Sequence, residues 1–314
     1  MKHLEVNHIG FGEIGGAGEV VYRVIRFSSY IVDTDHTDKE VVMPFIAPLS
    51  EPVEGADYSL NGQELLYSLC NLYHEMNDPH YPVPISERIR FWCQKNVQPY
   101  NLKELSESYK VDNSFWSWDL MQKDASFYVD EFVHDLCSLG MVMDYYNALY
   151  EARYKRNPYF SRNLYYEGKM QDSFPFFEKY ARFEDDEEYL AHIDEDYDYL
   201  EATLLGVFPE FKMSLQKDER TGQIGIYADI DSVFDIAWYA FERLVANDAP
   251  PLDTDEDADM LYSSASYICC LACGRYIKRK GPKQKYCDDP ACQAARKRMN
   301  FKNHYDRKKA RGEL

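Results

Sequence analysis

The sequence CLACGRYIKRKGPKQKYCDDPACQAARKR, residues 270–298, places four of the chain's eight cysteines in two close pairs. Two residues separate Cys270 from Cys273, and four separate Cys287 from Cys292, with thirteen residues between the pairs. Four thiolates can close a tetrahedral site, and soft sulfur ligands favour zinc. The spacing therefore predicts a structural Zn2+ ion held by these four cysteines. Cys269 stays open as an alternative to Cys270, because it would give a three-residue spacing in the first pair.

The residues around the cysteines predict a small folded module. Gly274 directly after the second cysteine permits a tight turn, and residues 276–286 around Gly281 and Pro282 predict a β-hairpin. Asp289 is suited to the N-cap of a helix and Pro290 to its first position, which puts Cys292 in the first turn. Zinc explains how so short a segment can fold, since a structural ion contributes on the order of 10 kcal/mol.

The predicted helix has two unlike faces at 100° per residue. One carries Ala294, Ala295, Phe301 and Tyr305, which we expect to pack on the hairpin and the metal. The other has the composition of a nucleic-acid contact surface, because Arg and Lys neutralise phosphates and Arg, Asn and His also bond base edges. A solvated basic face, or one docked on the protein's own acidic residues, is the alternative. The residues expected to contact nucleic acid, with DNA favoured over RNA, are Arg296, Lys297, Asn300, Asn303, His304, Arg307, Lys308 and Arg311.

Residues 270–277 and 285–298 resemble the treble-clef zinc fingers of CGNR-type bacterial proteins and related uncharacterised bacterial families. The resemblance covers about 45 residues and implies DNA binding in transcription regulation, with Cys270, Cys273, Cys287 and Cys292 as ligands and the helix 296–311 as the contact element. Two departures stand out. The tetrapeptide Cys-Gly-Asn-Arg is here Cys-Gln-Ala-Ala at 292–295, and the first cysteine pair is more tightly spaced.

The charge of the chain is distributed unevenly. The formal net charge is −19, yet residues 275–314 hold fourteen Lys and Arg against four Asp and Glu, a local charge of +10. Residues 1–274 therefore carry −29. Such asymmetry suggests a basic nucleic-acid arm on an acidic body. Solubility is the simpler explanation of the acidic body, and an intramolecular contact that masks the basic finger is the alternative hypothesis.

The remaining sequence predicts an α+β protein with a mostly helical body. We expect an acidic body at 1–247, β-rich over 1–50, helical over 60–205, and with a hairpin and helix at 210–247. An acidic linker follows at 248–259, and the zinc-finger module occupies 260–314. Strands are predicted at 20–27, 40–46, 211–216 and 224–227, and helices at 63–76, 86–95, 102–109, 113–155, 184–201 and 232–244.

Other chemical motifs are weak. Residues 10–15 match G-x-G-x-x-G, but a strand rather than a helix is predicted to follow, which favours a flexible loop. Glu131 and His134 form half of a di-iron motif without a second half. His74 and His80 lie at a predicted helix end and loop. Because no catalytic motif stands out, the sequence favours a non-enzymatic role.

These patterns predict a cytoplasmic protein, and the resemblance to bacterial families implies a bacterial or mobile-element one. No apolar run approaches the roughly 18 residues of a membrane span, and no secretion signal opens the chain. The leading prediction is a DNA-binding transcription regulator whose body senses a ligand or forms oligomers. One alternative is a zinc module that docks on a protein or an RNA-containing assembly. Another is an enzyme whose body holds the active site and whose finger serves for targeting.

Overall fold

The computed structural model describes most of the chain outside its N-terminus and several connecting segments. It divides into two compact units, Met1–Ala246 and Asn247–Leu314. The glycine motif at 10–15, His80, the predicted linker beyond Asp248 and Arg311 lie outside the described residues, as do the side chains of Asn303, His304 and Arg307. The described residues are 21–23, 25–38, 41–50, 53, 59–77, 82–102, 105, 118–154, 156, 183, 185–217, 224–228, 230–248, 267–270, 272–273, 275–278, 280 and 284–310.

Small antiparallel sheets form the N-terminal part of the first unit. Strand β1 (Val21–Arg23) pairs with β4 (Ser59–Asn61), and a second sheet has the order β2 (Tyr30–Asp38), β3 (Val41–Pro48), β5 (Phe127–Tyr128). The strand predicted at 40–46 is confirmed as β3. The strand predicted at 20–27 is wrong in length, since β1 ends at Arg23. Strand β2 was not predicted, because its polar half conceals the pattern.

Helices make up most of the described residues of the first unit, as predicted. Helix α1 (Gly62–Met76) and α2 (Ile85–Lys95) coincide with the predicted helices at 63–76 and 86–95. The single helix predicted over 113–155 is wrong, because the chain there forms α4 (Trp118–Asp124), β5 and then α5 (Val129–Tyr154). The interruption pairs Phe127 with Ile46 and Tyr128 with Phe45. Partners some eighty residues away therefore override the local helical pattern.

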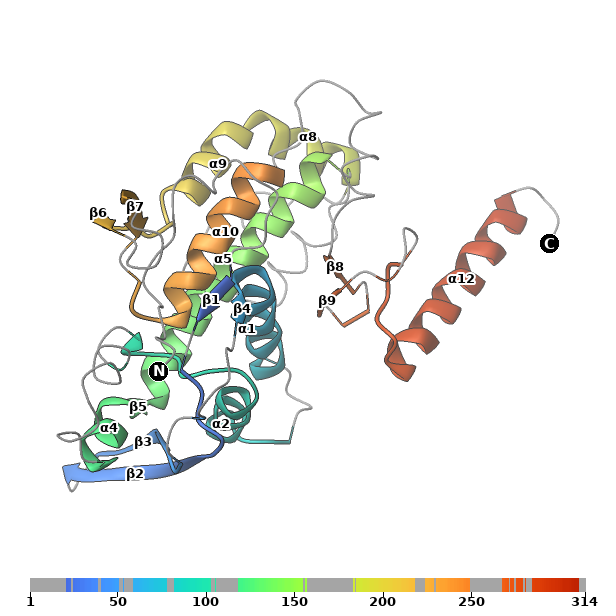
Figure 1. Cartoon of the computed structure of the whole chain (residues 1–314). Coiled ribbons are helices and arrows are strands. Elements are labelled where there is room, and N and C mark those ends of the chain that lie inside the picture. The colour runs from blue at the N-terminus through green and yellow to red at the C-terminus, as the bar shows by residue number, and fades with distance from the viewer. Residues whose placement is uncertain are drawn as a thin grey trace. The chain divides into compact units, whose positions relative to one another are not determined.

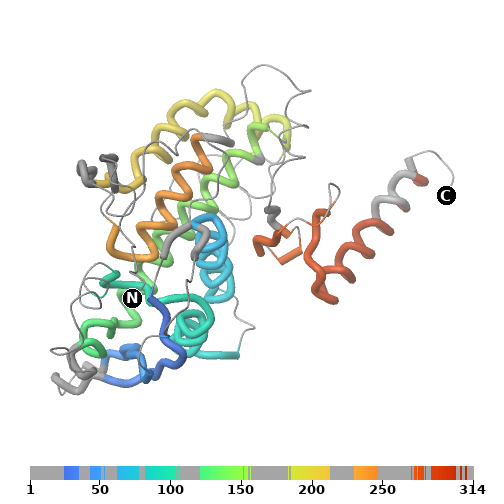
Figure 2. The backbone as a smooth tube through the Cα atoms, in the orientation of Figure 1, coloured from blue at the N-terminus to red at the C-terminus, as the bar shows by residue number. Residues whose placement is uncertain are grey.

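Helix α5 supplies the centre of the core. Phe132, Leu136 and Leu139 are fully buried. The Phe132 ring contacts Trp92 on α2 at 5.7 Å between centroids and Phe234 at 5.0 Å, on α10 (Val233–Asp248). Figures 1 and 2 show α10 running alongside α5. The first unit is thus organised around an aromatic cluster that joins three helices, in the edge-on ring geometries that aromatic pairs favour.

The acidic stretch at 184–201 folds as two helices rather than one. Asp185 caps α8 (Asp186–Glu195) by accepting hydrogen bonds from the backbone N–H groups of Glu187 and Glu188. Helix α9 (Tyr197–Leu205) begins after Asp196. The predicted apolar stripe is confirmed in part: Tyr189, Leu190, Ile193 and Leu200 are buried, whereas Tyr197 is partly exposed.

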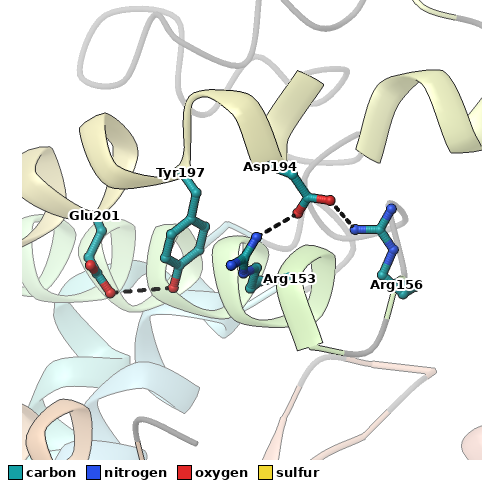
Figure 3. Close-up of polar contacts among 5 residues, drawn as sticks. All are labelled: Arg153, Arg156, Asp194, Tyr197 and Glu201. Carbon is teal, nitrogen blue, oxygen red and sulfur yellow. Dashed lines mark hydrogen bonds and ion pairs between the residues drawn. The ribbon is translucent and has the colours of Figure 1, made fainter. Parts of the chain in front are cut away.

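A carboxylate fork ties α8 to the end of α5. Asp194 accepts from Arg153 Nη1 at 3.1 Å and from Arg156 Nη1 at 2.6 Å, and Figure 3 shows the two guanidinium groups on either side of this carboxylate. The Arg153 guanidinium also lies 4.8 Å from the centre of the Tyr197 ring. Tyr197 Oη in turn donates to Glu201 at 3.4 Å. This network draws three helices together at a partly exposed surface.

The predicted C-terminal hairpin and helix of the first unit are confirmed. Strand β6 (Met213–Lys217) pairs antiparallel with β7 (Ile224–Ala228). Before α10, Ser232 Oγ accepts from the N–H of Asp235, and Asp235 Oδ2 accepts from the N–H of Ser232. This reciprocal arrangement is a capping box, which satisfies backbone donors that would otherwise lack partners. Across the described residues, no helix combines the length and the apolar character needed to cross a bilayer.

Substitution of Gly140 tests the packing of α5 on α1. A Cβ atom at Gly140 would overlap the buried Tyr73 ring. We expect Gly140→Ala to lower the free energy of unfolding by about 2 kcal/mol, because a large ring must shift in a packed core. Gly206→Ala is the matched control, since Gly206 ends α9 with a helical φ of −71°. Urea unfolding should show a change of about 0.5 kcal/mol or less there. Equal stability of the two variants would contradict the packing.

The pH dependence of stability has a specific contributor on α10. Burial raises the pKa of Glu242 to about 7. Between about pH 4.5 and 7 the folded chain holds a proton that the unfolded chain has lost, so this contribution to stability falls as the pH rises. Raising the pH from 4.5 to 8 should therefore lower the free energy of unfolding of the natural chain by on the order of 1 kcal/mol more than that of Glu242→Gln. Solvent screening of the half-exposed side chain keeps this difference small.

Urea unfolding at both pH values measures this difference. The exposed Glu210 provides the control, because Glu210→Gln should shift stability equally at the two pH values. If the stability of Glu242→Gln changed with pH by the same amount as that of the natural chain, Glu242 would not be the source of this pH dependence.

Candidate metal centre

The sulfur atoms of four cysteines converge in the second unit. The Sγ atoms of Cys270, Cys273, Cys287 and Cys292 all lie within 4.8 Å of one another, and those of Cys273 and Cys287 are 3.8 Å apart. Sulfurs bound tetrahedrally at about 2.3 Å from one ion stand about 3.8 Å apart. The cluster therefore has the donor atoms and nearly the dimensions of a tetrahedral metal site.

A short strand pair positions the first two cysteines. Strand β8 (Tyr267–Cys269) pairs antiparallel with β9 (Tyr276–Lys278), and Cys270 follows β8 directly. The N–H of Cys270 donates to the carbonyl of Arg275 at 2.8 Å, which closes the turn between the strands. The hairpin predicted over 276–286 is therefore wrong, since β9 pairs with the preceding strand β8 and not with the residues that follow it. The cluster uses Cys270, while Cys269 is the last residue of β8.

The start of a long helix positions the fourth cysteine. Helix α12 (Pro290–Ala310) begins as predicted, with Asp289 Oδ1 accepting from the N–H of Ala291 at 2.8 Å. Cys292 thus lies in the first turn. Gln293 Nε2 donates to the carbonyl of Cys287 at 2.7 Å, which links this turn to the third cysteine. The helix start and the segment before it therefore hold the second cysteine pair together.

The cluster is the apolar centre of the second unit. Cys270, Cys287 and Cys292 are buried, and Ile277 and Tyr286 pack against them. Cys273 is exposed on the outer side. The N–H of Cys287 points at Cys270 Sγ from 3.3 Å, a contact that favours the thiolate. Few other large side chains are available here, so the described residues offer little packing that could replace a bound ion.

Ionisation of the thiols is uneven without a cation. Burial raises the pKa of Cys270, but backbone N–H groups, chiefly that of Cys287, outweigh it and lower this pKa to about 7. Burial raises the pKa of Cys273 to about 11, and burial together with neighbouring thiols raises that of Cys292 further. Four thiolates this close repel one another strongly. A bound divalent cation removes that cost, because it deprotonates its thiol ligands.

The surface of α12 differs from the prediction in one respect. Arg296, Lys297, Asn300 and Lys308 are exposed, as a contact surface requires. Phe301 and Tyr305 do not pack on the hairpin and metal site, since they are 74% and 50% exposed. The physical reason is distance along the axis: at 1.5 Å per residue, Phe301 lies about 14 Å beyond Cys292. The apolar cover of the cluster comes instead from Ile277 and Tyr286.

The weaker motifs of the first unit form no metal site among the residues described. Glu131 and His134 are exposed on α5. His74 Nε2 lies 3.2 Å from Asp144 Oδ1, a contact between α1 and α5 that sequence reasoning missed. Nothing in the spacing of two residues seventy apart could have revealed this pair. The four cysteines are the cluster whose ligand atoms the described residues bring close enough to share an ion.

No protein-family model, curated protein or solved structure matches the chain. The cysteine geometry, rather than a relative, therefore carries the assignment of this site.

Metal analysis tests the cluster directly. We expect the full chain, dialysed after loading, to retain one divalent ion, and Cys292→Ala to retain essentially none, because three thiolates leave the tetrahedron open. Cys137→Ala is the control, since Cys137 lies on α5 in the first unit. Equal ion content in the Cys292→Ala variant and the natural chain would contradict a four-cysteine site.

Proposed function

We propose that the four cysteines hold a structural zinc ion and that α12, fixed by this ion, binds DNA. The protein is then a DNA-binding protein, most simply a transcription regulator, whose first unit senses a ligand or forms oligomers. Zinc is favoured because the donors are all sulfur and lie close enough together to share one tetrahedral ion. We infer a treble-clef finger because Cys270 and Cys273 lie in the turn between β8 and β9, while Cys287 precedes α12 and Cys292 lies in its first turn.

The exposed cationic surface of α12 is the observation that carries the proposal. The helix contains seven Lys and Arg and a single acidic residue, Asp306. A polyanion is the natural partner of such a rod, because each neutralised phosphate releases counterions and so favours binding. Asn300 adds an exposed amide that can bond base edges. The exposed basic side chains are Arg296, Lys297, Arg298, Lys308 and Lys309.

The negative charge of the first unit supports the proposal that DNA binds to the second unit alone. Met1–Ala246 contains 21 basic and 44 acidic residues, a net charge of −23. A surface of that sign repels phosphates. The first unit also has its own aromatic core. A separate role in sensing or assembly is consistent with both properties.

Salt-dependent DNA binding tests the proposal. We expect the zinc-loaded full chain to bind duplex DNA with an affinity that falls steeply with salt. In Lys297→Gln/Lys308→Gln the slope of log K against log salt should become shallower by about 1.8, because two phosphate contacts are lost. Fluorescence anisotropy at several salt concentrations provides the slope.

The control removes the same charge from the first unit. Lys95 and Lys123 are exposed there, and Lys95→Gln/Lys123→Gln should leave the slope unchanged. Equal effects of the two double variants would show that net charge, and not α12, governs binding. A natural chain that binds no DNA at low salt would refute the proposed function.

A further inference from the structure

The C-terminal half of α12 carries two aromatic side chains that the finger does not use. Phe301 is 74% exposed and Tyr305 is 50% exposed. The cluster is already covered by Ile277 and Tyr286. Figure 1 shows this half of α12 extending without another described element of the second unit beside it. Rings this exposed obtain only part of the free energy that full burial would provide, so their place on this helix leaves apolar surface available to a partner.

The two rings share one face with positive charge around them. Four residues separate them, which places them about 40° apart around the helix and about 6 Å apart along it. Arg298 precedes Phe301 by three residues, and Lys308 and Lys309 follow Tyr305 by three and four. All three basic side chains are exposed. We call these five residues, Arg298, Phe301, Tyr305, Lys308 and Lys309, the aromatic face.

This composition distinguishes between two kinds of partner. The cores of protein interfaces are depleted of lysine and of charge in general. Sites for single-stranded nucleic acid combine aromatic rings, on which bases stack, with cations that follow the backbone. The aromatic face has the second composition. A base must be unpaired to use it, because the faces of bases inside a duplex already stack on one another.

We propose that the aromatic face binds DNA through unpaired bases, which stack on Phe301 and Tyr305 while the flanking basic side chains neutralise phosphates. The proposal rests on the proposed function and specifies the form of DNA that the finger prefers. Opened DNA, such as a duplex with an internal bubble, is then a better ligand than the closed duplex. Arg296 and Asn300 are exposed on the opposite face of α12, so stacking on the aromatic face leaves them free to contact phosphates elsewhere.

The test compares three forms of one DNA sequence: a closed duplex, the same duplex with a central unpaired bubble, and the single strand. The zinc-loaded full chain is titrated against each at one salt concentration by fluorescence anisotropy. We expect the bubble and the single strand to bind on the order of tenfold more tightly than the duplex, since stacking acts on unpaired bases alone. Phe301→Ala/Tyr305→Ala should abolish this preference and change duplex affinity by about twofold or less.

Two further variants separate stacking from general surface effects. Met299 is similarly exposed, at 51%, but lies about 120° from Tyr305 around the helix, so Met299→Ala should keep the full preference. Tyr305→Phe should also keep it, because the ring is retained. Zinc content and helicity measured on each variant establish that the finger is intact.

The outcomes are distinct. No preference in the natural chain, or an equal loss on all three ligands in the double variant, overturns the inference while leaving DNA binding by α12 in place. A dimer that dissociates in Phe301→Ala/Tyr305→Ala, seen by sedimentation without DNA, also overturns it and makes the face an interface between copies. Failure to bind any of the three ligands refutes the proposed function itself.

Discussion

The convergence of four cysteine sulfurs is the constraint on which the second unit depends. Their Sγ atoms lie within 4.8 Å of one another, a spacing at which four negative charges require a cation between them. Cys270 and Cys273 lie in the turn between β8 and β9. Cys287 precedes α12, and Cys292 lies in the first turn of that helix. Among the described residues, the partly buried apolar side chains that pack on the cluster are Ile277 and Tyr286. Among the described residues, the start of α12 is therefore held by the cysteine cluster more than by apolar burial.

The first unit is stabilised by different physics. Phe132 joins rings from α2, α5 and α10, and Asp194 ties the ends of α5 and α8 through two arginines. Burial of large aromatic side chains contributes most here, while the arginine fork is partly exposed and contributes less. The two units therefore depend on different interactions. The proposal accordingly assigns DNA contact to the second unit and sensing or assembly to the first.

Local signals predicted the elements whose interactions are local. The capping residues Ser232 and Asp289 mark the starts of α10 and α12, because a cap acts on backbone groups two or three residues away. Strand β5 was missed, since its pairing with β3 depends on residues eighty positions earlier. The hairpin assigned to 276–286 was wrong for a related reason. The local sequence does not say whether the strand Tyr276–Lys278 pairs with the segment before it or with the segment after it. The backbone pairing in the structure shows that its partner is β8, which precedes it.

The sequence by itself determined the four candidate metal-binding cysteines, the charge of α12 and the acidic character of the body, because spacing and charge are properties of the chain. The tertiary structure was needed for the convergence of the sulfurs and for the exposure of Phe301 and Tyr305. Helical periodicity assigns residues to a face but does not say whether another element covers that face. Whether a face is covered depends on which residues pack along α12. The described residues that pack on the cysteine cluster lie near the start of the helix, well before Phe301 and Tyr305.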